Sequence, residues 1–326
     1  MSVSRRANYT GGSEPRRERF TIPLELAGAR LDRALARLLP GESRSRLAKL
    51  IEQGHVRVDG ATAAGRLRLK SGETVEVTLV PRPAEEGFRA EAIELAIVHE
   101  DDDILVVDKP AGLVVHPGSG NWAGTMLNAL LHHAPELERL PRAGIVHRLD
   151  KDTSGLLVVA RNESAQLELV RQLQARTVKR TYLAIVRGRV AAAGTVEAPI
   201  GRHPVQRTRM AVVAGGKPAV THYRVREALA AGTLLQCDLE TGRTHQIRVH
   251  LASIGHPIVG DPTYKGASSG SFDKLRTGSG RTAVIGRQAL HAWKLAFVHP
   301  RKGGLVGFES PMPDDMRAAL ERLRKS

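Results

Sequence analysis

The stretch Gly144–Arg161, G-I-V-H-R-L-D-K-D-T-S-G-L-L-V-V-A-R, joins two patterns that rarely occur together. Apolar runs rich in β-branched residues flank it on both sides, as in buried strands. Its centre holds five ionisable side chains: His147, Arg148, Asp150, Lys151 and Asp152. Because burying an unpaired charge is costly, the stretch is either a solvated polar turn or a reaction site held on rigid strands.

Composition favours a nucleic-acid partner. The chain has 326 residues, which is long enough for two domains. Lys and Arg number 49 against 34 Asp and Glu, a formal net charge of +15. Such a surplus predicts a polyanionic binding partner, and nucleic acid is favoured over an anionic membrane surface. Aromatic residues make up only 3%, which argues against a base-stacking platform. We therefore expect RNA or DNA to be bound by charge and shape.

Several classes of protein are not expected. No apolar run approaches the ~20 residues of a membrane span, and the N-terminus lacks the apolar segment of a secretion signal. The single cysteine, Cys237, allows no intrachain disulfide and fits the reducing cytoplasm. A phosphate-binding P-loop, zinc-binding pairs and an acidic calcium loop are all missing. The sequence thus predicts no metal and no nucleotide cofactor.

The N-terminal quarter predicts a basic flexible arm over residues 1–19 and a small module over residues 20–80. Leucines at helical spacing from Leu31 indicate a helix that Pro40 and Gly41 end, and Ser43 is placed to cap a second one. An Asp59-Gly60 turn and an alternating strand at residues 74–78 follow. Two helices and a hairpin resemble the RNA-binding module of the ribosomal-protein-S-four type. We expect the basic face of the second helix to contact phosphates through Arg44, Arg46 and Lys49.

Residues 81–90 have the composition of a linker, and residues 91–326 form one long domain. Its clearest predicted strands are 104–107, 113–115, 156–159, 182–186, 234–239 and 246–249, with helices at 126–132 and 164–174. The strands are too closely spaced for repeated βαβ units, so we predict an α+β fold on a mixed, mainly antiparallel sheet. The Gly/Ser-rich segment 266–281 predicts a flexible insertion.

Three polar stretches stand at predicted strand edges. Asp150 precedes a Thr-Ser-Gly turn, residues 179–182 (Lys-Arg-Thr-Tyr) open a strand, and residues 241–250 lead into another. These stretches could converge on one cleft if the strands are neighbours. Each also has a simpler explanation: Asp150 could satisfy turn amides, Tyr182 could be a core residue with a solvated hydroxyl, and Arg243 could be an exposed loop cation.

The ordered motifs resemble the RluA family of pseudouridine synthases. H-R-L-D-K-D-T-S-G at 147–155 looks like the family signature, and further counterparts occur in the family's order. They are K-P-A-G-L-V-V-H-P-G at 109–118, R-H-P at 202–204, G-K-P-A-V-T-H-Y at 216–223, T-G-R-T-H-Q-I-R-V-H at 241–250, G-D-P-T-Y at 260–264 and R-Q-A-L-H-A at 287–292. The resemblance covers almost the whole chain beyond the arm and is closest to members that carry the same N-terminal module. Segment 266–281 departs from the family pattern.

This resemblance implies a reaction and its residues. The enzyme would isomerise uridine in RNA to pseudouridine, with Asp150 as the essential carboxylate. Arg243 would pair with Asp150 and keep it ionised. Tyr182 would lie against the uracil and is a candidate base for the C5 proton, although a phenol of ordinary pKa ~10 is a poor base at neutral pH.

The resemblance also implies RNA contacts. Arg148 would fill the space left by a flipped-out nucleotide, and Lys109 and His116 would contact RNA. The substrate would be large-subunit (23S) rRNA or an assembly intermediate of that subunit, acted on by a monomer. Two alternatives remain open: a non-catalytic rRNA-binding assembly protein, and a glycosidase that stops after the N-glycosidic bond is cut.

Overall fold

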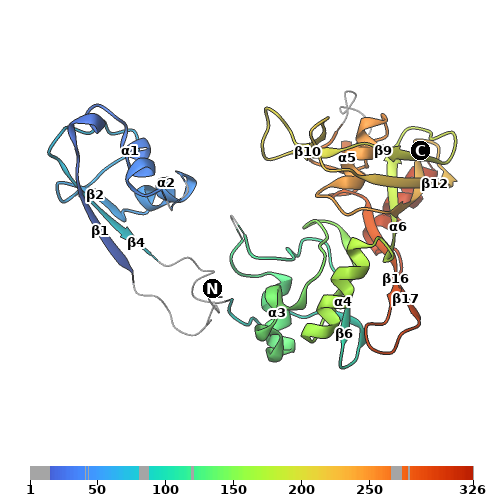
Figure 1. Cartoon of the computed structure of the whole chain (residues 1–326). Helices are drawn as coiled ribbons and strands as arrows, with labels where there is room; N and C mark the ends of the chain where they lie inside the picture. The colour runs from blue at the N-terminus through green and yellow to red at the C-terminus, as the bar shows by residue number, and fades with distance from the viewer. Residues whose placement is uncertain are drawn as a thin grey trace. The chain divides into compact units, whose positions relative to one another are not determined.

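The computed structural model describes residues 15–40, 42, 44–80, 88–118, 121–265, 274–277 and 280–325. The chain divides into two compact units, residues 1–88 and 89–326, which are described separately below (Figure 1). No helix in the described part of the chain has the length and apolar character needed to cross a membrane.

The first unit packs two helices on a small antiparallel sheet. The sheet has the strand order β1-β4-β2-β3. Its elements are β1 (Arg16–Thr21), a 3₁₀ turn (Leu24–Leu26), α1 (Leu31–Leu38), α2 (Arg44–Glu52), β2 (Val56–Val58), β3 (Ala61–Thr62) and β4 (Thr74–Leu79). This arrangement confirms the predicted pair of helices followed by a hairpin.

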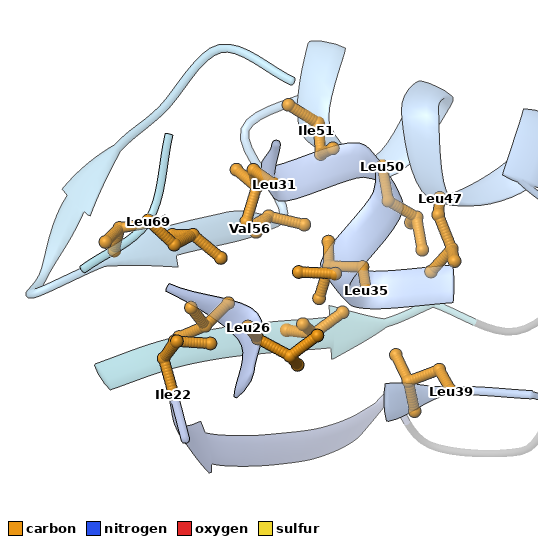
Figure 2. Packing of buried hydrophobic residues seen from close by; sticks show 14 of the residues in the cluster. Ile22, Leu26, Leu31, Leu35, Leu39, Leu47, Leu50, Ile51, Val56 and Leu69 are labelled. Carbon is orange, nitrogen blue, oxygen red and sulfur yellow. The ribbon is translucent and has the colours of Figure 1, made fainter. Parts of the chain in front are cut away.

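The buried apolar side chains of the helices and of the sheet pack together in one core (Figure 2). Leu31 and Leu35 lie on the same face of α1 and are fully buried, as is Leu47 of α2. Alternate residues of β4, Val75 and Val77, close the core from the sheet side. Burial of this cluster allows the unit to hold together around its own core.

The predicted arm is too long. Arg16–Thr21 form β1 and pair antiparallel with β4, so the strand begins inside the segment assigned to a flexible arm. Residues 1–14 and the predicted cap Ser43 lie outside the described residues, as do residues 81–87 of the predicted linker.

A nine-stranded sheet organises the second unit. Its order is β5-β6-β7-β16-β8-β13-β12-β9, with β17 paired to β16. The strands are β5 (Ala96–Glu100), β6 (Ile104–Lys109), β7 (Ser154–Ala160), β8 (Lys179–Arg187), β9 (Gly194–Glu197), β12 (Val220–Ala228), β13 (Gly232–Leu239), β16 (Leu290–Val298) and β17 (Leu305–Glu309). Only the β7–β16 pair is parallel among the described strands. The predicted mixed, mainly antiparallel α+β fold is confirmed.

The remaining elements lie around this sheet. The helices are α3 (Met126–His133), α4 (Glu163–Gln174), α5 (Gln246–Ser253) and α6 (Asp314–Arg324), with 3₁₀ turns at Pro135–Arg139 and Pro141–Gly144. Two hairpins stand apart, β10 (Ile200–Arg202) with β11 (Met210–Val212), and β14 (Lys274–Thr277) with β15 (Gly280–Ala283). The second hairpin is the described part of the predicted insertion.

Strand β7 fixes the position of the Gly144–Arg161 stretch. All seven of its residues are buried because the strand is central, between β6 and β16. Gly155 has φ +110°, and a Cβ there would come within 2.2 Å of the Ala292 carbonyl oxygen. Only glycine fits this close approach of β7 to β16, which ties the turn at Asp150 firmly to the sheet.

Two predicted strands are wrong. Residues 246–249 belong to α5, a helix whose first six residues are all buried. Its apolar residues therefore show no helical stripe, and the alternation of polar and apolar residues imitated a strand. Residues 113–115 contribute only a single bridge, from Val114 to Thr125.

Candidate active site and RNA-contact surfaces

Asp150 lies in the turn that leads into β7. The turn closes with the Thr153 N–H donating to the Asp150 carbonyl at 3.1 Å. The side chain is 16% exposed, and its Oδ2 accepts a hydrogen bond from Arg248 Nη1 at 2.9 Å. A guanidinium at this distance stabilises the ionised carboxylate and fixes its orientation.

Arg248 is held from its other side by Asp261. Its Nε and Nη2 donate to Asp261 Oδ2 at 2.7 Å and Oδ1 at 3.0 Å, a bidentate pair. Burial alone would lower the pKa of Arg248, but the bonds to Asp261 and Asp150 more than offset this and raise it above the ordinary value. Arg248 is thus a permanent cation, fixed between two carboxylates.

The predicted pair of Asp150 with Arg243 is wrong. Arg243 Nε donates to the Pro218 carbonyl at 3.1 Å, and Arg248 takes the place beside Asp150. The physical reason is the start of α5 at Gln246, which places Arg248 in the first turns of a buried helix. The sequence offered one indication of this pairing that was not used, Asp261 in the G-D-P-T-Y motif. A buried arginine needs such a carboxylate partner, and Asp261 pairs with Arg248.

His245 and Tyr264 complete the surroundings of Asp150 and were not predicted. Tyr264 Oη accepts from the Met210 N–H at 3.0 Å and lies 2.8 Å from His245 Nδ1, to which its hydroxyl can donate. The proton of the neutral imidazole then lies on Nε2, which is 3.9 Å from Asp150 Oδ1. Burial lowers the pKa of His245, which favours this neutral form.

Tyr182 comes to the same site from β8. It is only 6% exposed, and burial raises its pKa above the ordinary value. The charges of Arg180 and Asp150 also act on its pKa, Arg180 lowering it and Asp150 raising it. The three polar stretches therefore converge, as the sequence suggested, with Arg248 in place of Arg243.

Lys109 supports the turn and does not face RNA. Its side chain is fully buried, and Nζ donates to the carbonyls of Pro110, Leu113 and Lys151 at 2.7, 3.0 and 2.9 Å. Burial lowers its pKa to about 7. The predicted RNA contact is wrong because Lys109 ends a buried strand, and its ammonium instead joins that strand to the residue after Asp150.

Arg148 and His116 lie close enough to interact electrostatically. Burial, together with the charges of Arg142 and Arg148, lowers the pKa of His116 to about 4. Arg148 is exposed, so its guanidinium is available to RNA, whereas His116 is half-buried. His147 serves the fold, since its Nε2 accepts from the Val158 N–H at 3.2 Å.

In the first unit, the basic surface differs from the predicted one. Arg44 and Lys49 are exposed, but Arg46 is half-buried, donating to the Val80 carbonyl and pairing with Glu42. A groove of about 390 Å³ instead gathers five arginines: Arg30, Arg33, Arg37, Arg44 and Arg68. Three of these follow one face of α1 at positions i, i+3 and i+7, a spacing that the sequence displays.

One cluster in the second unit has metal-binding residue types. Asp101, Asp103 and His299 bring their ligand atoms within 4.8 Å of one another. Asp101 already accepts from Lys302 Nζ at 2.9 Å, and Asp103 from Arg301 Nε at 2.6 Å. These cations neutralise the carboxylates, so the cluster works as an ion-pair network that joins two loops.

Fold and site together define an RNA-modifying enzyme, and comparison with known proteins gives its family. Residues 103–253 match the RNA pseudouridylate synthase family model, and residues 29–75 match the S4 domain. The chain belongs to the RNA pseudouridylate synthase family and is an RNA pseudouridine synthase.

Two bacterial relatives match this chain over more than four fifths of their own length. Ribosomal large subunit pseudouridine synthase D of Nitrosomonas europaea is 58% identical over 94% of this chain and 87% of its own. The protein of that name from Neisseria meningitidis serogroup A is 52% identical, over 94% and 81%. Among solved structures, human RNA pseudouridylate synthase domain containing 1 is 30% identical, with a TM-score of 0.51 over 68% of this chain and 85% of that one.

Proposed function

We propose that this enzyme converts specific uridines of large-subunit (23S) rRNA to pseudouridine, with Asp150 as the reacting carboxylate. The observation that carries the proposal is the Asp150–Arg248–Asp261 chain of ion pairs beside the buried Tyr182. The names of the two bacterial relatives support large-subunit rRNA as the substrate.

The reaction balances without any external reagent. The N1–C1′ bond breaks, the uracil turns and a C5–C1′ bond forms; C5 loses its proton to solvent, and N1 takes up one proton in exchange. As its base departs, C1′ gains oxocarbenium character, which a carboxylate can stabilise or trap, as in retaining glycosidases. An ionised Asp150 suits each of three routes: attack on the sugar, attack on the uracil ring, or removal of a sugar proton.

The neighbouring residues then have distinct tasks. Arg248 orients Asp150 through their hydrogen bond, and Asp261 holds Arg248. The raised pKa of Tyr182 keeps its hydroxyl protonated at neutral pH and so unable to act as a base, and its ring serves best by packing against the uracil. Exposed Arg148 can occupy the space of the flipped nucleotide and offset part of the few kcal/mol that unstacking costs.

Location and assembly state follow from the proposed substrate. Ribosomal RNA, either free or in an assembly intermediate, places the enzyme in the cytoplasm, which agrees with its single buried cysteine, Cys237. We expect it to act as a monomer, since all the groups assigned to the reaction lie on one chain.

Tritium release tests the substrate. The full chain is incubated with 23S or 16S rRNA transcripts that carry 5-³H-uridine, and both released tritium and free uracil are measured. We expect release from the 23S transcript, or from a large-subunit precursor particle, without free uracil. Free uracil would indicate a glycosidase, and absence of release from every large-subunit substrate would indicate a binding protein.

A further inference from the structure

A second basic groove lies on the sheet of the catalytic unit, on the face away from Tyr182. Thr181 pairs with Asp238 and with Lys294 across neighbouring strands, whereas Tyr182 pairs with Cys237 and Ala292. Side chains alternate between the faces of a sheet, so Thr181 and its partners project opposite to Tyr182. The groove that they help to line has a volume of about 520 Å³.

Positive charge dominates this groove. Five cations line it against two carboxylates, Asp238 and Glu240; the cations are Lys179, Arg180, Arg224, Arg226 and Lys294. Both carboxylates already have partners within the fold, since Asp238 accepts from Thr181 at 2.6 Å and Glu240 lies 2.7 Å from His222. Of the five cations, Lys294 pairs with Glu309 at 2.8 Å, and the cations of the groove still outnumber its two carboxylates.

Three of the cations have no carboxylate partner among the described residues. Lys179 and Arg224 are exposed and form no ion pair with a described acid, and the same holds for Arg226. Arg180 approaches from the opposite face of β8; it is 9% exposed, and its Nε has no hydrogen-bond partner in the part of the chain that the structure describes. Arg180 Nη2 donates to the Glu240 carbonyl at 3.5 Å, so the one hydrogen bond of this buried cation goes to a neutral oxygen, and an anionic ligand would stabilise it further.

Two bulges shape the groove. The β12–β13 register shifts between Val225 and Glu227, and the β16–β8 register shifts between Ala292 and Lys294. The residues at these bulges, Arg226 and Trp293, come together, with the guanidinium 5.4 Å from the centre of the indole ring. Bulges re-aim side chains at functional positions, and here they hold a cation over the groove.

We propose that this groove, called here the β12 groove, binds the phosphate backbone of the RNA substrate at a site separate from Asp150. The inference rests on the proposed function, which supplies a long polyanion as the substrate. Charge complementarity identifies the occupant, because unpaired arginines on an open sheet face suit a chain of phosphates. A segment of rRNA beyond the target uridine is thereby held while the uridine reaches the catalytic face.

The test uses the full chain with Arg224→Glu and Arg226→Glu combined. The dissociation constant for a 23S rRNA transcript is measured by filter binding at several salt concentrations. We expect binding to be about 10-fold weaker. The slope of the logarithm of the binding constant against the logarithm of the salt concentration should be shallower by about 1.5, since each lost phosphate contact removes roughly 0.7–0.9 from it. The single-turnover tritium release rate at saturating RNA is expected to match the wild type.

A charge-matched control is Arg171→Glu with Arg317→Glu, two exposed arginines on α4 and α6 that do not line the groove. Its affinity is expected to stay within about threefold of the wild type. If both double variants weaken binding equally, the β12 groove has no special part in it and the proposal is overturned. Should the reversal variant fail to fold, Arg224→Gln with Arg226→Gln repeats the comparison.

Trp293 gives a second, local readout. The chain has two tryptophans, so Trp122→Phe leaves Trp293 as the sole indole. Polyuridylate should then change its fluorescence saturably, and the groove double variant should abolish that change. An unaltered signal at saturating polyuridylate would overturn the proposal. If the affinity, salt slope and fluorescence all change as expected but the wild type releases no tritium, the proposed function is overturned and the proposal that the β12 groove binds RNA still stands.

Discussion

Arg248 is the residue on which the geometry at Asp150 depends most. Its three hydrogen bonds run in two directions, one to Asp150 and two to Asp261. The planar guanidinium makes this possible, whereas a lysine ammonium keeps the charge but not the bidentate geometry. Asp150 is therefore fixed by a residue that is itself fixed.

Arg248→Lys is expected to lower the single-turnover rate about 100-fold, the size of loss that follows removal of one oriented charge-stabilising donor. The melting temperature should also fall, because buried Asp261 loses part of its pairing. Arg243→Lys is the matched control and should cost less than about fivefold, since it leaves Asp150 paired. A larger loss from Arg243→Lys than from Arg248→Lys would contradict the assignment.

Tyr182→Phe separates packing from proton transfer. Because burial raises the pKa of the phenol, its ionised form is scarce at neutral pH. We expect the phenylalanine variant to keep its single-turnover rate within about 10-fold, and Tyr182→Ala to lose far more through lost contact with the uracil. Equal, severe losses in both variants would assign the hydroxyl an essential role.

The sequence predicted Asp150 and Tyr182 but not the partner of Asp150. Arg243 and Arg248 stand five residues apart in one motif, and residue type alone does not distinguish them. The choice depends on where α5 begins and on Asp261, which lies 13 residues further on. Likewise, the burial of Lys109 depends on three carbonyls that approach it only in the fold.

At the scale of elements, α5 shows why a short buried helix resembles a strand in sequence. Its polar residues point inward as well and find partners there: Gln246 donates to the Val220 carbonyl, and His250 contacts Thr221 and Ala198. Because the helix is buried on every side, it has no polar face, and its sequence lacks the 3.6-residue alternation by which a surface helix is recognised. Elements with one buried and one exposed face, such as α1 and β4, were predicted correctly.

Buried histidines join the strands and helices of the catalytic unit. His291 of β16 is 1% exposed, with Nδ1 3.0 Å from Ser154 Oγ and Nε2 3.0 Å from the Ser310 carbonyl. His250 is fully buried and has the same kind of hydroxyl and carbonyl partners. Burial lowers the pKa of both, so the native state keeps them neutral.

A pH dependence of stability follows. The folded pKa of His291 lies below the unfolded value of about 6.5, so below that pH the unfolded chain binds the extra proton. The free energy of unfolding is therefore complete above pH 6.5 and falls as the pH drops through 6 and 5. We expect His291→Gln to reduce the loss between pH 7.5 and 5.5 by at most about 1.4 kcal/mol, measured by urea unfolding. Exposed His132→Gln is the control, and an unchanged loss in His291→Gln would contradict the account.

At the scale of the molecule, we expect the first unit to add RNA affinity and the second unit to carry the chemistry. The first unit, with its S4 match, carries the groove of five arginines, and the second carries Asp150. This expectation predicts that charge in the first unit contributes to affinity and its salt dependence but not to the reaction rate of the bound complex.

Arg33→Glu with Arg37→Glu in the full chain tests this division. Both residues are exposed on α1 and line the groove, so we expect weaker rRNA binding and a lower salt slope, with the single-turnover rate at saturating RNA unchanged. Arg57→Glu with Lys70→Glu, exposed residues outside the groove, is the control. A rate that falls as much as affinity would show that the first unit takes part in the chemistry.

The most direct test of the central claim compares wild type with Asp150→Asn, which keeps the shape of the side chain but removes its charge. Tritium release from 5-³H-uridine in 23S rRNA is followed under single-turnover conditions, with RNA binding measured alongside. The account predicts release and pseudouridine from the wild type, none above background from the variant, and affinity within about threefold. Release by Asp150→Asn at a rate near that of the wild type would contradict it.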